Sequence, residues 1–237
     1  KDMSGSDFFS TRDFTAEPCD FACVYCDGDR VITLNLDDPR AGSPGLTGRL
    51  NPAIEKLSTL AEFTVIPSRI IGALPETLSQ LNNLRFLAVN RNFISGGIPA
   101  TLGQLRTLRT LDLNYNQLNG SIPQSVAGLL ALSNVILGHN RLFGSVSTFV
   151  SQTLTRLNLK HNALSGSLSP TSLPSSIQYL SLSWNQLIGP VDRLLTRLNQ
   201  LNYLDMSLNS VTFPFIVLEE VMKMSSRVFF FFFFLGI

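Results

Sequence analysis

The clearest regularity in the chain is a set of leucines and other apolar residues that returns about every two dozen positions. In one copy the pattern LxxLxxLxLxxNxLxGxIP falls on Leu105, Leu108, Leu111, Leu113, Asn116, Leu118, Gly120, Ile122 and Pro123. The shared asparagine recurs with steps of 24, 24, 22, 23 and 24 residues, at Asn92, Asn116, Asn140, Asn162, Asn185 and Asn209. A period of this length indicates a repeat protein in which each unit stacks on the next.

Each repeat predicts one short strand at its LxL step. Alternate residues of a strand point to opposite faces, so we expect Leu111 and Leu113 inside, with Asp112 and Asn114 on the open face. Strands of successive repeats would stack in parallel about 4.8 Å apart. The six asparagines are expected to form a structural ladder, because an amide turned inward can pair with buried backbone groups.

The repeat divides the chain into three expected parts: a cap at 1–30, repeats at 31–212 and an irregular hydrophobic tail at 213–237. A divergent unit at 31–56 precedes repeat starts at residues 57, 81, 105, 129, 151, 174 and 198, which gives about eight units. Segment 37–45 is rich in Pro and Gly and is expected to be a surface loop. The predicted fold is a single α/β solenoid, a horseshoe or superhelix, with turns or 3-10 segments on its convex side.

The two ends of the chain depart from the repeat. Residues 1–10 lack the apolar run of a signal peptide, as a mature or trimmed N-terminus would. After Asn209 the pattern fails, and the apolar run after Arg227 contains about ten residues, including six consecutive phenylalanines, whereas a spanning helix needs about 20. We do not expect a transmembrane segment. We interpret the tail as an aberrant or prematurely ended product, and a degraded hydrophobic tail signal is the alternative.

Charge and motif content exclude several functional classes. Eighteen Lys and Arg residues face seventeen Asp and Glu residues, so a formal charge of +1 provides no global attraction for nucleic acid. The sequence has no nucleophile motif and no glycine-rich phosphate loop. Cys23 and Cys26 are two residues apart but lack a second ligand pair. We therefore expect neither an enzyme nor a cofactor.

Candidate binding residues occupy open-face positions around the LxL step, where side chains can vary without disturbing the core. Arg, Tyr, Trp and Phe are common in binding hot spots, although any exposed strand carries some polar and aromatic residues. His139 and His161 share one slot of consecutive repeats and should stack, but two ligands beside Lys160 do not predict a metal site. The predicted ligand-binding residues are Arg85, Phe86, Arg109, Asp112, Tyr115, His139, Arg156, Lys160, His161, Tyr179, Trp184, Tyr203 and Asp205, with Arg91 and Asn158 at further open-face positions.

The LxGxIP ending resembles the plant-specific class of extracellular leucine-rich repeats found in receptor kinases, kinase-less receptor-like proteins and polygalacturonase-inhibiting proteins. Segments 17–26 and 36–45 are similar to that class's N-terminal cap and to its receptor-like members, and the resemblance covers roughly 8–212. It implies a disulfide between Cys19 and Cys26, and hence an oxidising compartment. Cys23 departs from the family pattern, and a free thiol, an intermolecular bridge and a sequence peculiarity all stay open for it.

The same resemblance implies a secreted protein of the cell wall or cell surface that acts in signalling or defence. Its expected partners are a protein or peptide ligand or a wall polysaccharide across the concave strands, and a co-receptor kinase at one end. The alternatives are an inhibitor of secreted wall-degrading enzymes and a structural wall protein. Asn119 begins the sequon Asn119-Gly120-Ser121, which we expect in the turn after a strand, and is a candidate glycosylation site, although the repeat itself also generates this triplet.

Overall fold

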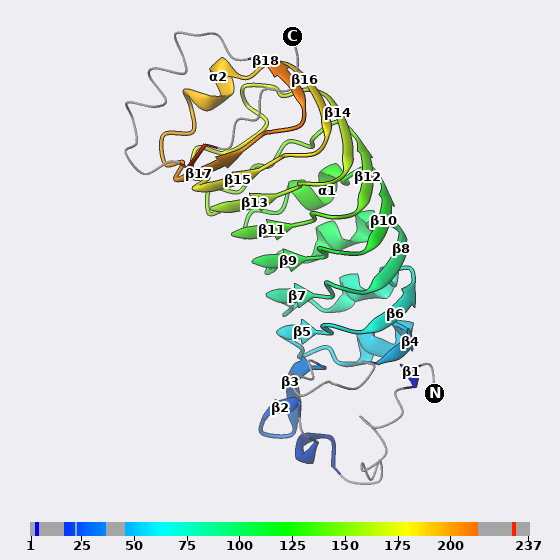
Figure 1. Cartoon of the computed structure of the whole chain (residues 1–237). Helices are drawn as coiled ribbons and strands as arrows, with labels where there is room; N and C mark the ends of the chain where they lie inside the picture. The colour runs from blue at the N-terminus through cyan, green and yellow to red at the C-terminus, as the bar shows by residue number, and fades with distance from the viewer. Residues whose placement is uncertain (1–2, 5–16, 22, 37–45, 213–228, 231–237) are drawn as a thin grey trace.

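The chain forms a curved solenoid whose units stack in sequence order (Figure 1). The computed structural model describes residues 3–4, 17–21, 23–36, 46–212 and 229–230. The predicted loop at 37–45 lies outside these residues, as does the predicted tail apart from the strand β19. None of the helices in the described part has the length and apolar character needed to cross a bilayer.

A sheet of short strands runs along the inner side of the curve, and we call it the concave sheet (Figure 1). Its order is β19-β17-β15-β13-β11-β9-β7-β5-β3-β2, all parallel except the antiparallel pair β2 and β3. The bounds are β2 Val24–Asp27, β3 Arg30–Asn35, β5 Glu62–Thr64, β7 Phe86–Ala88, β9 Thr110–Asp112, β11 Asn134–Ile136, β13 Arg156–Asn158, β15 Tyr179–Ser181, β17 Tyr203–Asp205 and β19 Phe229–Phe230. The predicted strand per repeat is confirmed here.

Each full repeat also contributes a strand to a second sheet, which the sequence pattern did not predict. Its order is β1-β4-β6-β8-β10-β12-β14-β16-β18, parallel except where β1 pairs with β4. The bounds are β1 Met3–Ser4, β4 Thr47–Arg49, β6 Arg69–Gly72, β8 Phe93–Gly97, β10 Gln117–Gly120, β12 Arg141–Gly144, β14 Ala163–Ser167, β16 Gln186–Pro190 and β18 Ser210–Thr212. These strands fall on the NxLxG step, whose central apolar residue is buried while its neighbours are outside. The step therefore alternates as a strand does.

The core is a continuous apolar spine between the two sheets. In β9, Leu111 lies in register with Leu87 of β7 and Val135 of β11, and all three are at most 1% exposed. Leu113, one residue past the strand, is likewise fully buried. Burying a Leu side chain contributes about 1.5–3 kcal/mol, and repeating the same contacts from unit to unit gives the fold its stability.

Single helical turns follow the second-sheet strand in several repeats, and one more, η1, lies in the cap. The bounds are η1 Pro18–Asp20, η2 Pro52–Lys56, η3 Glu76–Gln80, η4 Ala100–Gln104, α1 Gln124–Ala127 and α2 Asp192–Leu195. Pro75, Pro99 and Pro123 each stand at the N-cap, where a missing N–H costs nothing. Gly120, just before this turn, has a φ of 78°, which is the left-handed conformation that glycine adopts without strain.

The six repeat asparagines lie in one row and pair with buried backbone, as at Asn140. Its Nδ2 donates to the carbonyls of Leu113 and Leu137, each at 3.0 Å, and its Oδ1 accepts the N–H of Leu118 at 3.0 Å. The other five make the same set of bonds. Each asparagine thus bridges its own repeat and the repeat before it.

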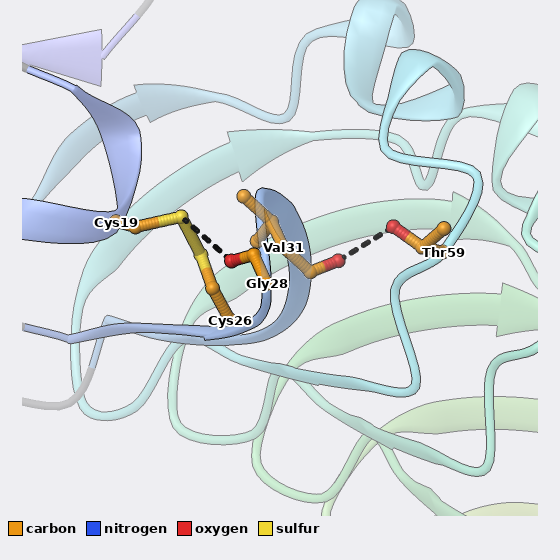
Figure 2. The surroundings of a disulfide bond; sticks show 5 residues. All are labelled: Cys19, Cys26, Gly28, Val31 and Thr59. Carbon is orange, nitrogen blue, oxygen red and sulfur yellow. Dashed lines mark hydrogen bonds between the residues drawn. A yellow bond between two sulfur atoms is a disulfide. The ribbon is translucent and has the colours of Figure 1, made fainter.

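The N-terminal cap is closed by a disulfide between Cys19 and Cys26, which Figure 2 shows. Cys23 takes no part in that bond and has a positive φ of 78°. The Thr59 hydroxyl donates to the Val31 carbonyl at 2.8 Å and ties the cap to the first full repeat (Figure 2). The antiparallel strand β2 covers the sheet edge that β3 would otherwise expose.

Candidate functional site

The residue just before each ladder asparagine has the same unusual backbone conformation. Arg91, Tyr115, His139, His161 and Trp184 all have φ between 52° and 56°, in the left-handed region that large side chains seldom adopt. Neighbouring repeats hold this backbone from both sides. At His139, the N–H donates to the Lys160 carbonyl at 2.9 Å, and the carbonyl accepts the Asn116 N–H at 3.2 Å. Leu208, before Asn209, has the same conformation, with a φ of 54°, so the conformation belongs to the turn of each of these repeats.

One continuous stack, which we call the ring ladder, is formed by the side chains of Arg91, Tyr115, His139, His161 and Trp184. The ring centroids of Tyr115 and His139 are 4.0 Å apart, those of His139 and His161 are 4.3 Å apart, and those of His161 and Trp184 are 4.8 Å apart. The Arg91 guanidinium lies 5.4 Å from the Tyr115 centroid and covers the first ring. The stacking of His139 on His161 agrees with their predicted shared slot. The ladder follows one edge of the concave sheet over five repeats.

A second, shorter stack crosses the C-terminal part of the concave sheet. Arg156, Tyr179 and Tyr203 are in register on β13, β15 and β17. The Arg156 guanidinium lies 4.0 Å from the Tyr179 ring centroid, and the two tyrosine rings stack at 4.3 Å. Burial, followed by the neighbouring Tyr179 and Asp205, raises the pKa of Tyr203 to about 12. Tyr203 therefore stays a neutral hydroxyl at physiological pH.

Two carboxylates predicted as ligand contacts, Asp112 and Asp205, each also hold a local turn. The Asp112 Oδ1 accepts the Asn114 N–H at 3.0 Å, and the Asp205 Oδ1 accepts the N–H and hydroxyl of Ser207 at 3.1 and 2.7 Å. Burial raises the pKa of Asp112, partly offset by the Asn114 N–H and by Arg156 and Arg91. Both carboxylates remain half-buried on the concave face, with one oxygen each already engaged.

The cations of the concave face form no ion pair with a carboxylate of the described part. Within the described ranges the one ion pair joins Arg30 and Asp27, at 3.1 Å in the cap. Arg85 and Arg109 are exposed in the same position of consecutive repeats, where the Arg109 N–H donates to the Arg85 carbonyl. Arg156 is exposed and Lys160 half-buried nearby. These cations therefore stay out of ion pairs within the described part, and Asp112 interacts with Arg156 only at longer range.

The two histidines are held neutral by their surroundings. Burial, then the neighbouring His161 and Lys160, lowers the pKa of His139 to about 4. Burial and Lys160 also lower the pKa of His161, against a weaker opposing effect of Asp205. The His139 Nε2 is enclosed and has no hydrogen-bond partner among the described atoms. Face-to-face stacking suits neutral imidazoles better than a shared metal ion, and no cluster of three or more metal-ligating side chains occurs in the described part.

Two further predicted positions differ in exposure: Phe86 is exposed on the concave face, and Asn158 is buried. Phe86 is exposed on β7 but is separated from the tyrosine stack by β9 and β11. Asn158 was predicted on the open face, and that prediction is wrong: it is 5% exposed, and its Oδ1 accepts the Lys160 N–H at 3.2 Å. It occupies the same strand position as Asp112 and Asp205 and closes the same kind of turn.

The candidate glycosylation residue, Asn119, lies on the second sheet. It is exposed on β10, between Gly97 of β8 and Arg141 of β12, and is not in a turn as the sequence suggested. The second sheet also exposes Phe93, Phe143 and Ile188, which the sequence analysis did not single out. Each is next in sequence to the buried apolar residue of the NxLxG step. The alternation of buried and exposed positions expected of a strand would have predicted their exposure.

Comparisons with known proteins agree with this geometry. Leucine Rich Repeat family models match residues 107–129 and 150–167. A comparison with curated protein sequences finds no match. Among solved structures, the chain is similar to the ectodomain of the receptor kinase GASSHO1/SCHENGEN3 from Arabidopsis thaliana, solved in complex with CASPARIAN STRIP INTEGRITY FACTOR 2. The identity is 27% and the TM-score 0.76, over 90% of this chain and 25% of that ectodomain.

Two further structures show the same similarity. A plant ice-binding protein is 26% identical with a TM-score of 0.69, over 86% of this chain and 73% of that one. A TDR receptor is 26% identical with a TM-score of 0.68, over 79% of this chain and 33% of that one. The chain thus spans only a quarter to a third of the length of the two receptors. The repeat motif, the parallel concave sheet and these similarities together identify the chain as a leucine-rich-repeat solenoid that is similar to plant receptor ectodomains.

Proposed function

We propose that the chain recognises an extended peptide or protein segment across its concave sheet, as the binding part of an extracellular signalling or defence protein. The ring ladder is the observation that carries this proposal. Its five side chains are pre-positioned by a fixed backbone and by mutual stacking, so binding would order few additional rotamers. Arg, Tyr and Trp are also the residue types that dominate hot spots.

The arrangement of the rings favours a peptide over a polysaccharide. Sugars commonly pack on the open faces of aromatic rings, but both faces of Tyr115, His139 and His161 are covered by their neighbours in the ladder. These three rings therefore offer edges rather than faces to a ligand. Ring edges are the positive part of an aromatic quadrupole, and they suit the carbonyl and carboxylate oxygens of a peptide.

Charge points to the same kind of ligand. Arg85, Arg109 and Arg156 form no ion pair in the described part, whereas Asp112 and Asp205 are each engaged in a turn. An acidic or acceptor-rich segment would complement this face and would be steered toward it. The GASSHO1/SCHENGEN3 structure, a complex with a named factor, supports ligand binding by this fold. A co-receptor kinase at one end and a place in the wall or at the cell surface are further parts of the proposal.

The test selects ligands without assuming their sequence. A displayed library of random peptides is selected on the full chain, and enriched peptides are titrated by calorimetry against wild type and the triple variant Tyr115→Ala, His139→Ala, Trp184→Ala. We expect the variant to lose at least about tenfold in affinity, since each hot-spot truncation costs about 1–2 kcal/mol or more. Enriched peptides should carry more Asp and Glu than the starting library.

A matched control removes side chains two positions further along each of the same repeats. The variant Gln117→Ala, Arg141→Ala, Gln186→Ala changes the second sheet and should bind the selected peptides like wild type. The proposal fails if no peptide is enriched, or if the ring-ladder variant binds the enriched peptides as tightly as wild type. Thermal unfolding of both variants shows whether they are folded at the assay temperature.

A further inference from the structure

A depression of about 620 Å³ lies between the first two repeats, on elements other than the concave strands. It is lined by residues 48–52 and 71–75. These are the same step of consecutive repeats, where β4 leads into η2 and β6 leads into η3. The proposed peptide site uses none of these residues.

The lining is mostly apolar. Leu50 and Leu74 are buried, and Pro52, Pro75 and Ala73 complete much of the wall. Ile71 is 47% exposed and presents its aliphatic side chain at the rim. Phe93 of β8 pairs in register with Ile71 and is 49% exposed, so the apolar surface continues past the rim.

One cation interrupts this apolar lining. Arg49 stands where the following repeats have the small residues Ala73, Gly97, Ser121 and Ser145. Its side chain lies close to Gly72: a Cβ added to that glycine would be 3.4 Å from the Arg49 Cδ. No carboxylate of the described residues forms an ion pair with Arg49. An exposed guanidinium is thus positioned against an apolar hollow without a counter-ion among the described residues.

We propose that this depression binds a small apolar acid, a ring system or short aliphatic body that carries a carboxylate or sulfonate. The apolar body would cover Ile71 and the proline-rich wall, and its anion would meet the Arg49 guanidinium, which can donate two parallel hydrogen bonds to such a group. Hollows that combine apolar lining with one placed charge are the usual form of small-molecule sites. This site is independent of the proposed peptide site.

The test uses two fluorescent probes of nearly the same shape, the anion anilinonaphthalene sulfonate and its uncharged analogue phenylnaphthylamine. Both are titrated into the full chain, and the saturable component of the fluorescence is fitted. We expect Arg49→Gln to weaken binding of the anion about tenfold, the usual effect of losing one charge-assisted contact, and to leave the neutral probe unchanged. Ile71→Ser should weaken both probes.

Matched controls come from the same sheet. Phe143→Ser removes an exposed apolar residue that, like Ile71, directly precedes a glycine, and Arg141→Gln removes an exposed arginine from the same strand. Neither should change the Arg49-dependent component. The apolar end of the sequence can bind such dyes itself, so the readout is the difference between variants. Equal anion binding by wild type and Arg49→Gln overturns the proposal, as does an equal loss in the Phe143→Ser or Arg141→Gln variant.

Discussion

The imidazole rings of His139 and His161, from consecutive repeats, lie 4.3 Å apart at an interplanar angle of 20°. Two positive imidazolium rings would repel each other at this distance, and Lys160 adds a further positive charge. The stack is therefore built for neutral rings. This relationship leads to the first two predictions, which use the histidines as internal probes of the ring ladder.

Protonation of His139 should destabilise the fold. Its pKa is about 4 in the folded chain against 6.5 for an unperturbed histidine, so the unfolded state binds the proton more readily between these values. The contribution of His139 to stability is full above about pH 6.5 and is lost as pH falls toward 4. Urea unfolding at pH 7 and pH 5 should show a smaller difference for His139→Gln than for wild type. The raised pKa of Asp112 acts in the opposite direction and is common to both proteins. An unchanged pH dependence in the variant would contradict this account.

Trp184 should report the charge of its stacking partner. It is the single tryptophan of the chain, and its ring lies 4.8 Å from His161. A protonated imidazole quenches an excited indole by accepting an electron, so emission should fall as pH drops through the His161 pKa, which is below 6.5. The titration should disappear in His161→Gln. A midpoint above 6.5, or a titration that survives in the variant, would show that the ladder does not form in solution.

Truncating one member of the asparagine ladder should weaken the whole chain. Asn140→Ala leaves the Leu118 N–H without its acceptor, while the Leu113 and Leu137 carbonyls each lose one donor and keep Asn116 and Asn162, respectively. A buried backbone N–H left unpaired costs about 1–3 kcal/mol, so we expect a loss of about that size in the free energy of unfolding. Asn202→Ala is the control, because Asn202 is exposed and should change stability by less than about 0.5 kcal/mol. Equal effects of the two substitutions in urea unfolding would disprove the structural role.

Breaking the Cys19–Cys26 disulfide should loosen the cap while sparing the central repeats. The bond closes a loop with a sequence separation of 7, for which chain entropy gives a stabilisation of about 2.5 kcal/mol. Hydrogen exchange in Cys19→Ser, Cys26→Ser should accelerate in β2 and β3, and β9 to β15 should exchange as in wild type. This locality follows because each repeat contacts mainly its neighbours. Uniform acceleration along the solenoid would instead indicate one cooperative unit.

Sequence periodicity predicted the spine and the asparagine row, because both depend on one residue type returning at a fixed step. Leu111 and Leu113 had to point inward if successive units were to bury a shared core. The second sheet was missed since its step ends in glycine, as at Gly120, and was interpreted as a turn. That misreading also placed Asn119 in a turn instead of on β10.

The sequence predicted which residues lie on the concave face better than it predicted the contacts that their side chains make. The slot shared by His139 and His161 indicated stacking, whereas the extension to Tyr115 and Trp184 depends on side-chain orientations that a sequence does not specify. Asn158 occupies an outward strand position, yet its amide folds back onto the backbone of Lys160. A short polar side chain can accept a hydrogen bond from the backbone N–H two residues later, and strand alternation alone does not predict this bond.

The asparagine row gives the solenoid a direction, because every amide reaches back to the repeat that precedes it. A genetic duplication or deletion of whole periods presents each amide with an equivalent backbone and leaves no orphaned polar group. A break within a period separates an amide from the N–H and carbonyl that it serves. Lineages of such chains can therefore lengthen or shorten by whole modules, and the area available for recognition changes in the same discrete steps.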